Sequence, residues 1–285
     1  MFYSGSAATG QVAALVVLTP SESKRLIARA VAALPEIKHA LSGGYIVIGS
    51  GSTNAYVAEE LTGQTIDKLL YLAGVITGGQ LSVMPLSKRT HPLVLKAGHA
   101  VDTSPQQALK DFGPDDVFIK GASAVDAQGN AGVLVASESA GTIGMAWPVV
   151  APRGSHLIVP VGLEKMVPSV AEASRHCTIH RFKYSMGVPV ALIPMVNARV
   201  VTEVQAIEVL SGARATHVAS GGIGGCEGAV VLSIEGSEAQ VETAFAIVKG
   251  VKDEPPLAEP SGRFDRAAEL GYDAAAIWKG WRSSY

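Results

Sequence analysis

Cysteine is scarce in this sequence, and the two cysteines present form no recognisable pattern. Cys177 and Cys226 lie far apart in the 285 residues, and neither belongs to a Cys-x-x-Cys motif or to a complete zinc-ligand set. The sequence therefore excludes a disulfide framework and predicts no metal site. Such sparse use of cysteine is typical of a reducing compartment.

Charge of one sign and long apolar runs are also lacking. The formal net charge is −2, so no basic excess indicates binding to nucleic acid or to an anionic membrane surface. No stretch approaches the ~18 apolar residues that a membrane-spanning helix needs. The first twenty residues lack the basic region of a signal peptide. We therefore expect a cytoplasmic protein with no nucleic-acid and no membrane partner.

Apolar residues and glycines are abundant, at 48% hydrophobic residues and 31 glycines. Apolar runs are followed repeatedly by a glycine turn and then by a helical pattern. This order predicts an α/β protein with a mostly parallel sheet covered by helices on both faces, a three-layer α/β/α arrangement. The expected strands include residues 12–19, 45–48, 69–76, 92–96, 116–120, 131–136 and 155–161.

The C-terminal third predicts a separate unit. We expect a ligand-binding core over residues 1–198 and a small α+β subdomain over residues 199–252. Residues 253–285 would form a linker and a tail that carries Trp278 and Trp281. Two tryptophans on a free tail would be an unusual exposed patch, so we expect the tail to dock on the body or on a neighbouring subunit of a homo-oligomer.

One loop predicts a binding site for an anion. It runs from a strand through a glycine turn into a helix, where the first N–H groups have no partner within the helix and the helix dipole is positive. The first turn of this helix contains no Asp or Glu that could occupy those N–H groups. The residues expected to bind the ligand here are Gly49, Ser50, Gly51, Ser52, Thr53 and Asn54.

A plain capped turn would explain the same residues, because short glycine motifs are weak signals. The loop is neither Gly-x-Gly-x-x-Gly nor a Walker A motif, and no lysine follows it. The sequence therefore favours a small phosphorylated metabolite over a dinucleotide or a nucleoside triphosphate.

Several segments resemble one superfamily. Residues 45–54, Tyr-Ile-Val-Ile-Gly-Ser-Gly-Ser-Thr-Asn, resemble the ligand-binding turn of ribose-5-phosphate isomerase, where a Gly-Ser-Thr turn opens a helix and binds a sugar phosphate. Residues 115–130 resemble the strand, Gly-Ala, acidic residue and Gly-Asn stretch of sugar isomerases and family I CoA transferases. Residues 141–144, Gly-Thr-Ile-Gly, resemble the glycine loop that follows, and residues 156–161 resemble the next strand, as in the lactate-utilisation branch.

Over residues 44–203, the order of these segments is similar to the NagB/ribose-5-phosphate isomerase/CoA transferase-like superfamily. The resemblance implies the fold of that superfamily and a sugar phosphate or CoA thioester as ligand, with CoA as a substrate rather than a bound cofactor. Sugar isomerases often carry an Asp where Ser123 stands, and the Glu-Asn-Gly nucleophile motif of CoA transferases is absent. Catalytic roles therefore do not transfer directly.

Three residues are candidates for catalysis. Asp126 could abstract a proton next to a carbonyl, and Lys120 could stabilise the resulting enolate. Glu138 could act as a carboxylate nucleophile toward an acyl-CoA. Each could equally be structural, as a turn-capping Asp, a surface Lys and a loop acid. The two enzyme hypotheses are thus an isomerase and an acyl transferase, and a non-catalytic phosphometabolite sensor is the third.

Further glycines and basic residues complete the expected ligand site. Lys88 and Arg89 lie between two strands and could close over a phosphate, although charge clusters are usually solvated loops. The other residues expected to contact the ligand are Gly78, Gly79, Gly121, Gly141 and Thr142.

Overall fold

The computed structural model describes residues 11–258, so Trp278 and Trp281 of the expected tail lie outside the described part. The helices in this part are α1 (Pro20–Ala33), α2 (Pro35–Gly43), α3 (Ser52–Thr62), α4 (Pro105–Lys110), α5 (Gly141–Arg153), α6 (Val170–His176), α7 (Glu203–Ser211) and α8 (Glu238–Lys249). The strands are β1 (Val12–Leu18), β2 (Tyr45–Ile48), β3 (Gly74–Thr77), β4 (Gln80–Val83), β5 (Leu93–Lys96), β6 (His99–Ala100), β7 (Val117–Ile119), β8 (Ala124–Val125), β9 (Ala131–Val135), β10 (His156–Pro160), β11 (Ala191–Met195), β12 (Arg199–Val201), β13 (Arg214–Gly221) and β14 (Ala229–Gly236).

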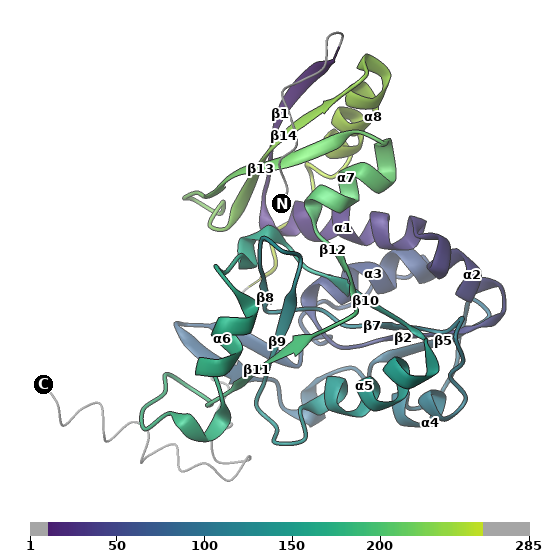
Figure 1. The fold of residues 1–285 in the computed structure, drawn as a ribbon, viewed down its shortest axis with the longest axis vertical. Helices are drawn as coiled ribbons and strands as arrows, with labels where there is room; N and C mark the ends of the chain where they lie inside the picture. The colour runs from purple at the N-terminus through teal and green to yellow at the C-terminus, as the bar shows by residue number, and fades with distance from the viewer. Residues whose placement is uncertain (1–10, 259–285) are drawn as a thin grey trace, which may run out of the picture.

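A six-stranded mixed sheet lies at the centre of the larger part of the molecule. Its strand order is β12-β10-β7-β2-β5-β6. The first four strands run parallel, whereas β5 and β6 are antiparallel to their neighbours. Helices α1, α2 and α3 lie on one side of this sheet, and α4 and α5 lie on the other (Figure 1). The chain is therefore a mixed α/β protein, as its alternating apolar strands and helices predict.

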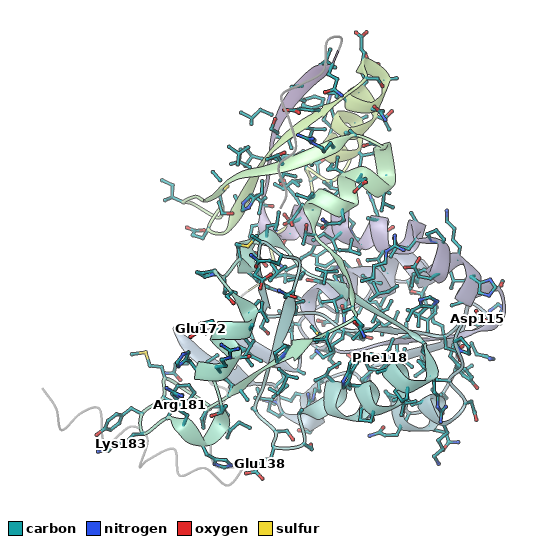
Figure 2. All side chains as sticks on the ribbon, in the orientation of Figure 1. Asp115, Phe118, Glu138, Glu172, Arg181 and Lys183 are labelled. Carbon is teal, nitrogen blue, oxygen red and sulfur yellow. The ribbon has the colours of Figure 1, made fainter. Side chains whose placement is uncertain are left out.

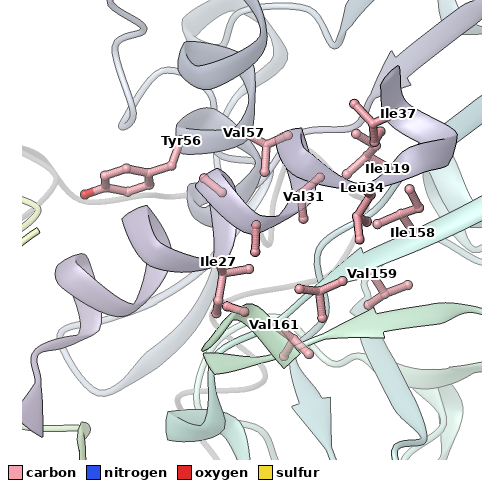
Figure 3. Packing of buried hydrophobic residues seen from close by; sticks show 14 of the residues in the cluster. Ile27, Val31, Leu34, Ile37, Tyr56, Val57, Ile119, Ile158, Val159 and Val161 are labelled. Carbon is pink, nitrogen blue, oxygen red and sulfur yellow. The ribbon is translucent and has the colours of Figure 1, made fainter. Parts of the chain in front are cut away.

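The core forms where the amphipathic helix α1 packs on the sheet. Ile27, Val31 and Leu34 recur at the spacing of one helix face, and they lie against Ile158 and Val159 of β10 (Figure 3). All five side chains are fully buried. Ile27, Val31 and Leu34 thus lie on the one face of this segment that packs on the sheet.

The smaller sheet combines the two ends of the described chain. Strand β1 pairs antiparallel with β14, which pairs in turn with β13, and α7 and α8 lie beside this sheet (Figure 1). The sequence predicts β1 as part of the core over residues 1–198, but its partner β14 lies more than 200 positions away in the chain. The sequence also predicts β12 as part of the subdomain over residues 199–252, whereas β12 pairs with β10 at the edge of the large sheet.

Two segments differ from their expected secondary structure. Residues 68–71 form a turn within the run predicted as a strand, and the strand β3 begins only at Gly74. Residues 141–144, which resemble a glycine loop, form the first turn of α5 instead. No helix between residues 11 and 258 has the length and the apolar character needed to cross a membrane.

Candidate functional site

A cavity of about 1310 Å³ opens at the carboxyl edge of the parallel strands. The residues that follow β2 and β7 line it, together with Glu164 and Lys165 beyond the end of β10. Because β2, β7 and β10 run parallel, their carboxyl ends meet at one edge, which is where α/β sheets place ligands. Topology thus brings together residues that lie more than 100 positions apart in the chain.

The start of α3 forms one wall of this cavity. Within residues 11–258, the N–H groups of Ser52, Thr53 and Asn54 have no acceptor in the protein. Gly51 is the N-cap residue and therefore supplies no capping side chain, and the first turn contains no acid. Gly51 and Ser52 are partly exposed, whereas Thr53 and Asn54 are buried. The helix entrance therefore keeps free donors at its positive end, without a carboxylate of the described chain on them.

Hydrogen bonds to Tyr71 and Asn54 hold the loop before α3 in place. The Gly51 N–H donates to the Tyr71 carbonyl at 2.9 Å, and the Tyr71 hydroxyl donates to the Ile48 carbonyl at 2.7 Å. The Asn54 amide nitrogen donates to the Gly49 carbonyl at 2.7 Å. Gly51 adopts a φ of 150°, which L-residues with side chains rarely reach. Asn54, which the sequence predicts as a ligand contact, is instead fully buried, and its side chain holds the loop through the Gly49 carbonyl.

Lys120 crosses this loop from the neighbouring strand. A Cβ atom on Gly49 would lie 3.4 Å from the Lys120 Cδ and 3.2 Å from the Ile119 carbonyl oxygen, so the glycine leaves room for the lysine stem. Lys120 also lines the cavity. Burial, and then the nearby Lys165 ammonium, lower the pKa of Lys120 to about 8. The structure thus places a weakly basic amine directly after β7, the parallel neighbour of the strand that leads into α3.

Two more lysines and a glutamate complete the basic wall. The Lys24 Nζ lies 3.1 Å from the Glu164 Oε1, and the Lys165 Nζ donates to the Ala122 carbonyl at 3.1 Å. Burial, and then Lys24, lower the pKa of Lys165 to about 8. Behind them the fully buried Glu203 accepts the Leu163 N–H, and burial raises the pKa of its carboxyl. Glu203 thereby anchors the segment that carries Glu164 and Lys165.

A second helix entrance lines the same cavity. Gly141 and Thr142 open α5, and the N-cap residue Ala140 has a left-handed backbone with a φ of 57°. No side chain caps this helix, and its first turn contains no acid. The expected contacts Gly121, Gly141 and Thr142 therefore do lie on the cavity wall.

Asp126 occupies a structural position. Its side chain is 1% exposed and accepts the N–H groups of Gln128, Asn130 and Val170, together with the Asn130 side-chain amide. Burial alone would raise the pKa of Asp126, but these donors lower it on balance. Asp126 is not among the residues that line the cavity. This position does not support the expected role of general base, because the carboxylate is already saturated with donors.

Glu138 lies at the surface, far from the core residue Phe118 (Figure 2). Its carboxylate lies 2.9 Å from the exposed His180 Nε2, and it does not line the cavity. Its position therefore gives no support to an acyl-transfer nucleophile.

The expected lid residues divide into two groups. Arg89 lines the cavity, whereas Lys88 is exposed and does not. Gly78 and Gly79 form the turn between β3 and β4, each with a positive φ, and they also lie off the cavity wall. These two glycines are required by the hairpin turn rather than by a ligand.

Sequence reasoning missed Lys24, Glu164 and Lys165. A signal for the last two was present, because Gly162 follows the apolar strand β10 as Gly49 follows β2 and Gly121 follows β7. Lys24 lies within α1 and carried no comparable signal. Among residues 11–258, no group of three or more His, Cys, Asp or Glu side chains could hold a metal ion.

A scan against protein-family models, a search of curated proteins and a search of solved structures found no match to this chain.

Proposed function

We propose that this chain binds a phosphorylated small molecule in the cavity, with the phosphate on the free amides of Ser52 and Thr53, which line it. The observation that carries the proposal is a helix entrance without a capping side chain or a nearby carboxylate, open to a cavity. Such an entrance combines unpaired N–H donors with the positive end of the helix dipole, and this combination is an anion site.

The charges around the cavity support an anionic ligand. Among the described residues, four basic side chains line it and only two acidic ones, Asp102 and Glu164, although the whole chain has a net charge of −2. One of the acids, Glu164, is already paired with Lys24. A basic pocket in a weakly acidic protein favours a ligand with at least one negative group.

A sugar phosphate and an isomerase-like reaction fit this site better than acyl transfer. Proton transfer next to a carbonyl needs a carboxylate that reaches the ligand, and Glu164 takes this role in our proposal in place of Asp126. Acyl transfer would need an activated carboxylate nucleophile, and the surface position of Glu138 argues against one there. The fold in this proposal is the three-layer fold of the sugar isomerase and CoA transferase superfamily, which the parallel strands and the Gly-Ser-Thr turn support.

The proposal is tested by placing a carboxylate at the helix entrance. Ser52→Asp puts an acid in the first turn, where it occupies the free amides and interacts favourably with the dipole. We expect the free energy of unfolding without ligand to rise by about 0.3–1 kcal/mol. We expect the same variant to lose the increase in thermal midpoint that inorganic phosphate and ribose 5-phosphate give to the unmodified protein.

Ser52→Asn is the matched control, because it has the same shape without the charge and should keep the phosphate response. Ribose without phosphate should give no response, and CoA compounds extend the panel to the other ligand class. A phosphate response that persists in Ser52→Asp would refute the site on α3. If ribose 5-phosphate binds but is not converted, the isomerase hypothesis is refuted and a non-catalytic sensor is favoured.

A further inference from the structure

The three lysines around the cavity differ in what holds their amines. Lys24 is paired with Glu164 and also donates to the Pro20 carbonyl at 3.1 Å. Lys165 donates to the Ala122 carbonyl. The Lys120 Nζ has neither a hydrogen bond nor an ion pair with any described residue. One amine at the cavity, on a partly buried lysine, is thus left without a partner among the described residues.

The position of Lys120 is set by the backbone on both sides. It directly follows β7, and its N–H donates to the Ile158 carbonyl at 3.0 Å. Its stem passes over Gly49, two residues before the N-cap of α3. The partnerless amine and the free amides of α3 therefore follow two adjacent parallel strands, β7 and β2, at the same edge of one sheet.

The surroundings of Lys120 also keep its amine reactive. Burial disfavours the charged form of Lys120, and the Lys165 ammonium repels it, so the pKa of Lys120 falls to about 8. At pH 7.5, roughly a quarter of such an amine is unprotonated, against about one part in a thousand for an ordinary lysine. A desolvated lysine next to another cation is the arrangement that activates an amine as a nucleophile.

We propose that Lys120 forms an imine with the aldehyde or ketone carbonyl of a phosphorylated ligand whose phosphate is bound at the start of α3. This inference rests on the proposed function, and it adds the carbonyl to the description of the ligand. The amine nitrogen attacks the carbonyl carbon, and the carbonyl oxygen takes up a proton as the nitrogen loses one. The carbinolamine then loses its hydroxyl with a second proton as water, and the nitrogen lone pair forms the C=N bond. One water is released, and nothing is oxidised or reduced.

Pyridoxal 5′-phosphate is a suitable probe, because it carries an aldehyde and a phosphate. The full-length protein is incubated with the probe, reduced with borohydride, digested and mapped by mass spectrometry. We expect one predominant label, on Lys120, which inorganic phosphate reduces. We expect pyridoxal, which lacks the phosphate, to label Lys120 at least ~10-fold less at the same concentration. The labelling rate should rise with pH around a midpoint near 8.

Lys120→Arg should lose this label, whereas Lys110→Arg, which changes an exposed lysine on α4, should keep it. Mapping of the unmodified protein makes the result independent of whether the Lys120 variant folds. Labels spread over surface lysines, with none on Lys120, would overturn the imine even if phosphate still raises the thermal midpoint. Equal labelling of Lys120 by pyridoxal and by its phosphate would instead overturn the phosphate site on α3, and with it the proposed function.

Discussion

The carboxylate of Asp126 joins a turn to the start of α6, because it accepts N–H groups from Gln128, Asn130 and Val170. Asp126→Asn removes the charge and turns an amide toward these donors. We expect a loss of about 2–3 kcal/mol in the free energy of unfolding, since hydrogen bonds to a charged group are stronger than neutral ones. Urea denaturation measures this loss. Phosphate affinity of the folded variant should change less than about 2-fold.

The loss should also depend on pH in one direction. Because the pKa of Asp126 is lowered in the folded protein, its contribution to stability is complete above the unfolded pKa, about 3.9, and disappears as the pH falls through the lower folded value. The difference between the unmodified protein and Asp126→Asn should therefore shrink below pH 4. A variant with unchanged stability that no longer converts a bound sugar phosphate would restore Asp126 as a catalytic group.

Lys120 should affect stability in the opposite sense. Its folded pKa of about 8 lies below the unfolded value of about 10.4, so the folded state binds fewer protons between these two values. The buried ammonium therefore costs stability below pH 8, and this cost disappears as the pH rises to about 10.4. We expect Lys120→Met to raise the thermal midpoint at pH 7, and we expect the gain to shrink between pH 8 and pH 10.4.

Lys110→Met provides the control for this measurement, because Lys110 is an exposed lysine outside the cavity. Lys110→Met should leave the thermal midpoint nearly unchanged at pH 7 and between pH 8 and pH 10.4. A Lys120→Met variant that melts lower than the unmodified protein at pH 7 would show that the amine has a stabilising partner and is not available for chemistry.

At the level of elements, a local sequence pattern predicts secondary structure only where contacts between neighbouring residues determine it. The glycine turn and the absence of Asp and Glu from Thr53 to Tyr56 predict a helix start without an acid, and the structure has that start at Ser52. The run at residues 69–72 is as apolar as the runs that form strands, but Tyr71 hydrogen-bonds to Ile48 and Gly51 and so holds the loop before α3. An apolar run is compatible with a strand or with a buried turn, and the partner of Tyr71 that decides between them is not adjacent in sequence.

The start of α5 also shows that local sequence does not determine secondary structure, because residues that disfavour a helix lie inside one. Gly141 and Gly144 are typical of a loop, and Pro148 and Pro152 are typical of helix breaks, yet all four lie within α5. Gly141 and Thr142, which the resemblance of residues 141–144 to a glycine loop selects as ligand contacts, line the cavity, but these residues are helical. Tertiary contacts outweighed local propensity here.

The site was predicted in part for a similar reason. A glycine turn directly follows Lys120 and indicates its position in the sequence, whereas Lys165 comes three residues after Gly162 and only strand order brings it to the same edge. An acid that follows a strand, such as Asp126, can be a general base or a turn cap, and only the number of its hydrogen-bond donors separates the two. Sequence thus indicates which strand ends carry chemistry, and topology decides which of them meet.

At the scale of the whole molecule, α1 connects the two sheets. Strand β1 pairs with β14 in the small sheet, and Thr19 then caps α1, which packs on the large sheet. A capping box between Thr19 and Glu22 fixes this junction. The small sheet is therefore built from both ends of the described chain, and a cut near residue 198 would separate β1 from its partner.

This architecture predicts the behaviour of a fragment. Residues 1–198, the expected core, would expose Val16 and Leu18, which are at most 5% exposed in the whole protein. They would also leave β1 as an unpaired strand edge, which promotes association between chains. We expect the fragment to aggregate or to lack a cooperative thermal transition, as size-exclusion chromatography and circular dichroism would show beside the full-length chain. Adding residues 199–258 as a second chain should restore a soluble complex, because they supply β14. A monomeric fragment that melts as cooperatively as the full-length protein would mean that the large sheet folds without the small one.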